Sequence, residues 1–163
     1  MIRIIGAAAR LLSHVAAIAL LAMVLVNVVD VGMRSAFNEP IFGTFEIVEL
    51  LLAVVAFLVI PEAFLREGHI IVELIDQVVP PRAVDGLKAF GMTATVAYLA
   101  LLVWAMVTPA VDVVRFHEVT FSLQIPTIFE YAPVLLGIAA ALVAALVIFM
   151  RDVKNALGGG RRP

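Results

Sequence analysis

Four long apolar runs, separated by short polar segments, dominate the hydrophobic pattern of the chain. The runs cover residues 11–31, 44–65, 89–111 and 127–150. A helix of 21 to 24 residues rises about 1.5 Å per residue and crosses a hydrocarbon core of about 30 Å. The pattern therefore predicts an all-α integral membrane protein with four transmembrane helices, which together form one membrane domain over residues 1–163.

A shorter segment, residues 69–79, follows the second run and is too short to span. Its polar residues recur at i, i+4, i+7 and i+8, a spacing that places them on one stripe of a helix. They are His69, Glu73, Asp76 and Gln77. Eleven residues make about 16 Å of helix, roughly half a bilayer. We predict a short amphipathic helix at the membrane surface between the second and third spans.

The two ends of the chain are polar. Arg3 and Arg10 precede the first run, which is longer than the apolar region of a signal peptide and has no A-x-A cleavage site after it, so we expect an uncleaved first span. Residues 151–163 are expected to form a disordered polar tail.

The distribution of lysine and arginine predicts the orientation. Nine of these residues lie in the N-terminus, the connection after the second span and the C-terminal tail, whereas the other two connections hold two. The positive-inside rule then places both termini and the surface helix in the cytoplasm.

Composition excludes several functional classes. Hydrophobic residues make up 64% of the chain, against about 45–50% in soluble domains. The absence of cysteine excludes disulfides, Cys-ligated zinc and thiol catalysis. A net charge of −2 without a basic patch gives no indication of nucleic-acid binding. No catalytic triad, paired carboxylates at mid-span, metal-ligand spacing or phosphate-binding glycine loop is evident, so we expect no enzyme and no cofactor.

The middles of the four spans are apolar. Their midpoints are Leu20–Leu21, Val54–Val55, Ala100–Leu101 and Ile138–Ala139, and no span has Gly or Pro at its centre. A self-sufficient carrier or channel needs polar groups at this depth. The pattern argues against transport by this chain alone.

Two glutamates open the second span. Glu46 and Glu49 lie at i and i+3, so both face roughly the same side. For Glu49 the alternatives are contact with a partner or with Arg34, or an N-terminal acid solvated by headgroup water. For Glu46 the sequence favours the solvated acid, stabilised by the helix dipole.

The fourth span carries small residues at four-residue spacing: Gly137, Ala141 and Ala145. Such residues allow close contact between helices. They predict either packing within the chain's own bundle or a face against a larger partner.

Three stretches together resemble the small membrane subunit, DctQ-like, of tripartite ATP-independent periplasmic (TRAP) transporters. The first is NVVDVGMRSAFNEPIFGTFEIVELLL, the second FLREGHIIVELIDQVVP and the third EVTFSLQIPTIFEYAPVLLG. Where many relatives have tryptophan ahead of the acids in the second span, this chain has Thr44–Phe45. The motif positions that the resemblance assigns to a partner interface or to structure are Arg34, Glu46, Glu49, Gly68, His69, Glu73 and Pro126.

The resemblance implies a multi-pass protein of the bacterial inner membrane with two protein partners besides membrane lipid. A large membrane subunit would hold the sodium and substrate sites, and a periplasmic binding protein would deliver a carboxylate-bearing solute. This chain would be the stationary scaffold. The alternative is a self-contained, homo-oligomeric four-span exporter, but the small multidrug transporters of that class need a membrane-embedded Glu in the first span, and residues 11–26 contain no acid.

Overall fold

The computed structural model describes residues 2–67 and 81–157, and nearly all of them are helical. The helices are α1 (Ile2–Phe37), α2 (Thr44–Leu58), α3 (Ile60–Glu67), α5 (Pro81–Phe116) and α6 (Ile128–Leu157). Within the described residues, four stretches are long and apolar enough to cross a membrane, with α2 and α3 together forming one of them. The prediction of an all-α protein with four membrane-spanning helices is confirmed. The predicted surface helix, residues 69–79, lies outside the described residues.

Three helices are longer than the apolar runs that predicted them. α1 continues to Phe37, and α5 continues through Pro109 to Phe116, in a stretch whose last residues were expected to belong to a loop. The first part of the C-terminal tail, residues 151–157, is helical as the end of α6, in contrast to the disorder expected there. Hydrophobicity marks only the part of a helix that lies in lipid. The helix itself extends as far as its backbone hydrogen bonds continue, so it can be longer than the apolar run.

The second span is not one continuous helix. It breaks at Val59, between α2 and α3, two residues before the fully buried Pro61. Proline has no N–H, so the carbonyl of Phe57, four residues earlier, has no helical donor. The break at Val59 lies past the centre of the span, Val54–Val55. The apolar residues at the centre therefore did not predict it.

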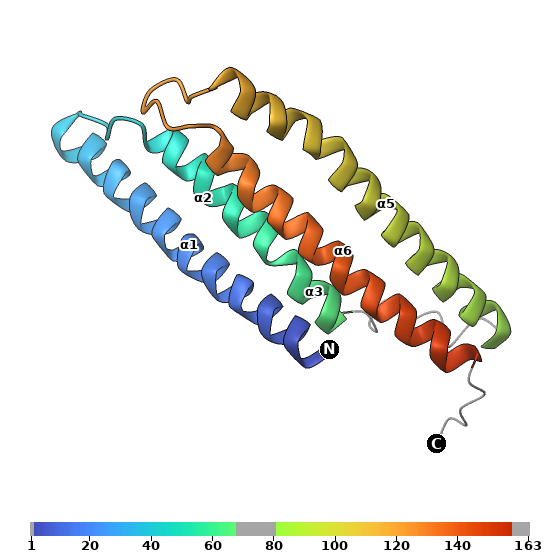
Figure 1. The fold of residues 1–163 in the computed structure, drawn as a ribbon. Coiled ribbons are helices and arrows are strands. Elements are labelled where there is room, and N and C mark those ends of the chain that lie inside the picture. The colour runs from blue at the N-terminus through green and yellow to red at the C-terminus, as the bar shows by residue number, and fades with distance from the viewer. Residues whose placement is uncertain (1, 68–80, 158–163) are drawn as a thin grey trace.

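The helices form an open layer and do not close into a ring. α2 packs on α1 and α6, and α5 packs on α6, so the order across the layer is α1, α2–α3, α6, α5 (Figure 1). The chain therefore consists of two helical hairpins that meet through α2–α3 and α6. Both hairpin connections, residues 38–43 and 117–127, lie at one end of the layer, which we call the loop end (Figure 1).

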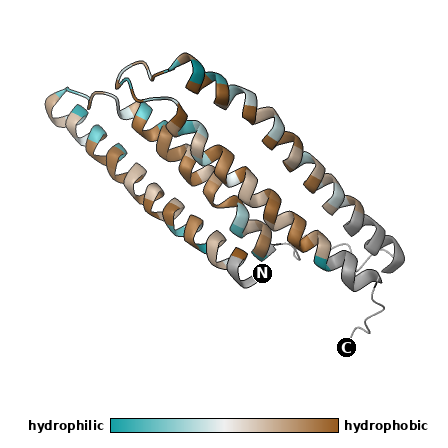
Figure 2. Ribbon diagram, viewed as in Figure 1, coloured by the Kyte–Doolittle hydropathy of each residue, from teal (hydrophilic) through white to brown (hydrophobic). Residues whose placement is uncertain are grey.

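The hydrophobic core lies along α6. In the most apolar stretch of α6, 39% of the residues are buried inside the protein. The corresponding share is 11% to 17% in the other three spans. The remaining apolar side chains of the spans face outward, and apolar residues colour most of the length of the helices (Figure 2). An arrangement that exposes so much apolar surface is suited to lipid or to a membrane partner, and not to water.

Candidate functional site

Glu46 joins the two hairpins at the loop end. Its residue is only 8% exposed. The carboxylate accepts hydrogen bonds from the backbone N–H groups of Ser122 and Leu123, the latter at 2.8 Å. These two donors belong to the tip of the connection before α6, 76 and 77 residues further along the chain. Glu46 is thus buried under the second loop, in contrast to the headgroup-solvated acid that the sequence favoured.

The loop that Glu46 holds has further internal order. Val119 and Pro126 form an isolated antiparallel bridge, and Thr120 bonds to Ile125 through both its backbone N–H and its hydroxyl oxygen. Without Glu46, the two N–H groups at the tip would have to find water or other acceptors. The arrangement of the loop therefore depends on one carboxylate from the other hairpin. Pro126, one of the motif positions, is therefore one of the two residues that form this bridge.

Gly43 completes the contact between the two loops. It adopts the left-handed conformation (φ 77°) as the residue before α2, and a Cβ atom there would collide with the side chain of Leu123. Glycine satisfies both requirements, because it tolerates positive φ and has no side chain.

Asp30 holds the first loop in a similar way. Its residue is 5% exposed. It accepts hydrogen bonds from the backbone N–H of Ile41 at 2.9 Å and from the hydroxyl of Thr44 at 3.1 Å, and it forms an ion pair with Arg34 at 2.9 Å. Asp30 was not among the site residues predicted from the sequence, although an acid four residues before an arginine near a helix end is a recognisable signal.

Arg34 and Glu49 are not partners. Arg34 bonds to Asp30 on its own helix, so the expected alternative of an Arg34–Glu49 contact is not formed. Glu49 is exposed on α2, whereas Glu46 is buried. Two acids three residues apart therefore have different surroundings, one inside the protein and one on its surface.

The small residues of α6 pack inside the layer. A Cβ atom at Gly137 would overlap the backbone carbonyl of Phe57, so α6 and α2 touch at this point. The carbonyl involved is the one that Pro61 leaves without a helical donor. Ala141 and Ala145 are 0% exposed and belong to the same buried cluster. We call this contact between α6 and α2–α3 the seam. Of the two interpretations of these residues, internal packing is the one that the structure supports.

A further acid, Glu62, lies where α3 packs on α1, near the opposite end. Glu62 forms an ion pair with Arg66 at 2.6 Å, and its mostly buried side chain lies beside Ser13 and His14 of α1. Most of the Arg66 side chain is exposed. The ion pair itself lies within α3, past the break in the second span.

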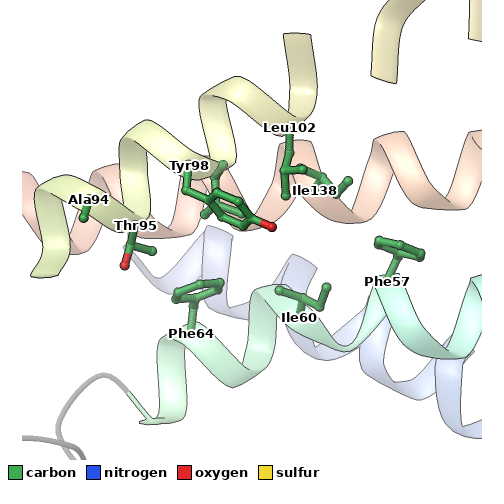
Figure 3. Close-up of a pocket in the computed structure, with 9 residues that line it drawn as sticks. Phe57, Ile60, Phe64, Ala94, Thr95, Tyr98, Leu102 and Ile138 are labelled. Carbon is green, nitrogen blue, oxygen red and sulfur yellow. The ribbon is translucent and has the colours of Figure 1, made fainter. Parts of the chain in front are cut away.

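An apolar cavity of about 490 Å³ lies between α3 and α5, with α6 as its floor. Phe57, Ile60 and Phe64 face Tyr98 and Leu102 across it (Figure 3). The polar groups of its lining residues are the hydroxyls of Thr95 and Tyr98, and no lining residue is charged. A carboxylate-bearing solute or a sodium ion would lose its hydration there without gaining an opposite charge or a set of oxygen ligands. The cavity does not suit either of them.

Three further motif residues, Gly68, His69 and Glu73, lie outside the described residues. Within residues 2–67 and 81–157, no group of three or more His, Asp or Glu side chains is placed to hold a metal ion. His14 lies near the start of α1 and His117 lies at the loop end, so the two are not together.

The fold and these contacts define a multi-span membrane protein whose polar side chains fix its loops and helices to one another. A family comparison identifies it further: residues 23–155 match the family described as tripartite ATP-independent periplasmic transporters, DctQ component. The match covers most of the chain, and the chain belongs to this family of transporter components. Searches of curated proteins and of solved structures each find no match.

Proposed function

We propose that this protein is the stationary small subunit of a sodium-coupled, binding-protein-dependent uptake transporter for a carboxylate-type solute. The observation that carries the proposal is the open layer of helices with apolar midpoints. Over residues 2–67 and 81–157, such a layer encloses no polar path, whereas transport across a membrane needs polar groups at mid-depth. The transport chemistry then belongs to another subunit.

The partners in this proposal are a large membrane subunit and a periplasmic binding protein. Membership of a tripartite family supports the number of components. The layer also leaves apolar residues on its outer helices, among them Leu21 and Leu25 of α1 and Trp104 of α5. Such residues need lipid or a membrane-embedded partner. Because the small-residue stripe is already used inside the layer, the partner contact would lie on other faces.

The test is reconstitution of the components separately and together. The small subunit alone in liposomes should bind neither sodium nor a carboxylate solute and should transport nothing. Co-expressed with the large subunit, it should copurify as a stable pair. Uptake should require the pair, the binding protein and a sodium gradient together.

Two results would contradict the proposal. Gradient-driven flux through liposomes that contain only this chain would favour the homo-oligomeric exporter. Full uptake by the large subunit and binding protein without this chain would exclude a required scaffold.

The same proposal places the protein in the bacterial inner membrane with the loop end on the periplasmic side. The two-against-nine distribution of lysine and arginine supports this orientation. Because the chain has no native cysteine, single substitutions can be probed with an impermeant thiol reagent on intact cells whose outer membrane admits the reagent. Glu39→Cys and Glu118→Cys should be labelled and Arg151→Cys protected. The reverse pattern would overturn the orientation.

A further inference from the structure

A second groove, apolar along most of its length, lies between α5 and α6, nearer the loop end than the cavity beside Tyr98. Its volume is about 420 Å³, and it is lined by Val107, Ala110, Val111, Val114 and Arg115 of α5 and Leu135 of α6. The three valines lie at i, i+4 and i+7, so they share one face of α5, and each is about half exposed. The groove is therefore open to the surroundings of the span, which in a membrane are lipid or another membrane protein.

The one charged lining residue, Arg115, lies at the depth of lipid headgroups. It follows Leu101, at the midpoint of the span, by 14 residues, which corresponds to about 21 Å for a helix along the membrane normal. Half of a bilayer measures about 15 Å of hydrocarbon, or about 20–22 Å with its headgroups. Val107 and Val111 then lie beside the acyl chains, while the guanidinium lies at the level of the phosphates.

The charge of Arg115 is available to a ligand. In the part of the chain that the structure describes, Arg115 forms no ion pair and no side-chain hydrogen bond, in contrast to Arg34 and Arg66. Asp112 and Glu118 flank it at three residues on either side, the first half-buried and the second exposed. A purely anionic headgroup would be repelled by these carboxylates, whereas a zwitterionic headgroup offers them an ammonium group.

We infer that this groove binds one zwitterionic phospholipid from the leaflet at the loop end. One acyl chain lies along the valine face of α5, the phosphate binds the Arg115 guanidinium, and the ammonium group meets Asp112 or Glu118. Guanidinium suits phosphate because it donates two parallel N–H groups to the phosphate oxygens. The combination of an apolar groove with a charge at headgroup depth distinguishes this site from the general contact of a span with lipid tails. The inference depends on no other subunit and so goes beyond the proposed function.

The experiment measures lipid binding to the purified full chain in detergent by native mass spectrometry. The probes are a phosphatidylethanolamine, the diacylglycerol with the same acyl chains, and inorganic phosphate. The wild type should bind one phosphatidylethanolamine about tenfold more tightly than the diacylglycerol, which lacks the phosphate, and should not bind inorganic phosphate, which lacks the chains. Arg115→Gln should lower the affinity for phosphatidylethanolamine about tenfold, and Arg115→Lys should retain most of it.

The headgroup preference is measured with phosphatidylglycerol, which has the phosphate but no ammonium group. It should bind several-fold more weakly than phosphatidylethanolamine. Asp112→Asn combined with Glu118→Gln should remove this difference, because the carboxylates that select the ammonium group are then neutral. A preference for phosphatidylglycerol in the wild type would overturn the assignment of a zwitterionic lipid.

Val111→Trp tests the apolar part of the groove, because the larger side chain would occupy the space of the acyl chain and should weaken binding. Val28→Trp is the matched control: Val28 is exposed to a similar extent but lies on α1, so binding should be unchanged. Arg34→Gln is the control for charge at the same end of the protein, since Arg34 is paired with Asp30.

Equal affinity for phosphatidylethanolamine and diacylglycerol would overturn the inference, as would unaltered binding in Arg115→Gln. Displacement of the lipid when the large subunit binds would also overturn it, because the groove would then be a contact between subunits. Failure of the wild-type chain to pair with a large subunit would instead contradict the proposed function, and the lipid affinities of the chain alone would stand.

Discussion

The loop end and the seam connect the same two hairpins by different physical means. At the loop end, the Glu46 carboxylate accepts N–H groups from a loop of the other hairpin. At the seam, α6 approaches the backbone of α2 because Gly137 has no side chain. A hydrogen bond to a carboxylate tolerates small displacements, whereas close backbone contact does not.

This difference indicates how each region would respond to substitution. The loops carry backbone groups without secondary-structure partners, so a buried acceptor is what fixes them. The helices already satisfy their backbone groups internally, so only shape decides how closely they approach. One exception is the Phe57 carbonyl, which Pro61 leaves without a helical donor at the point where Gly137 approaches.

The largest effect is expected at the seam. Gly137→Leu would place a side chain where the Phe57 backbone lies and would separate the two hairpins. Overpacking of this kind costs about 1–3 kcal/mol or more, and backbone cannot move aside as a side chain can. Thermal unfolding in detergent should show a marked loss of stability. Ala139→Leu, on an exposed face of the same helix, is the control and should have little effect, while a stable Gly137→Leu variant would exclude the close contact.

A smaller effect is expected at the loop end. Glu46→Gln keeps the shape of the side chain but removes the charge that strengthens its bonds to Ser122 and Leu123. The melting temperature should fall by several degrees, and amide exchange at the loop tip should accelerate. Glu49→Gln, three residues away and exposed, is the matched control for stability. Equal destabilisation by both substitutions would contradict the distinction between the two acids.

The smallest effects are expected in the first loop, and there Arg34→Ala should have a smaller effect than Asp30→Ala. Asp30→Ala removes the acceptor for the N–H of Ile41 and the hydroxyl of Thr44, so the first loop should loosen. Arg34→Ala removes only a mostly exposed ion-pair partner, a change worth about 0–1 kcal/mol. Amide exchange of residues 38–43 should therefore increase clearly in the first variant and slightly in the second. The reverse order would show that the arginine, and not the aspartate, organises the loop.

The sequence alone determined the class and the family of this protein. Apolar runs of 21 to 24 residues predict membrane spans because the thickness of the bilayer fixes their length, and residues 23–155 match the family from their sequence alone. Both are properties of neighbouring residues, so no three-dimensional information was needed.

The tertiary structure decided what the selected residues contact. Glu46 and Glu49 share a helix face by spacing, but only Glu46 meets the loop, whose donors are backbone N–H groups that no side-chain pattern reveals. Gly137, Ala141 and Ala145 were compatible with an internal or an external face, since small residues allow close packing with any neighbour. The position of Phe57 on α2, 80 residues earlier in the chain, makes the face internal. Contacts between residues so far apart depend on how the hairpins pack, and the local pattern of hydrophobic and polar residues does not contain that information.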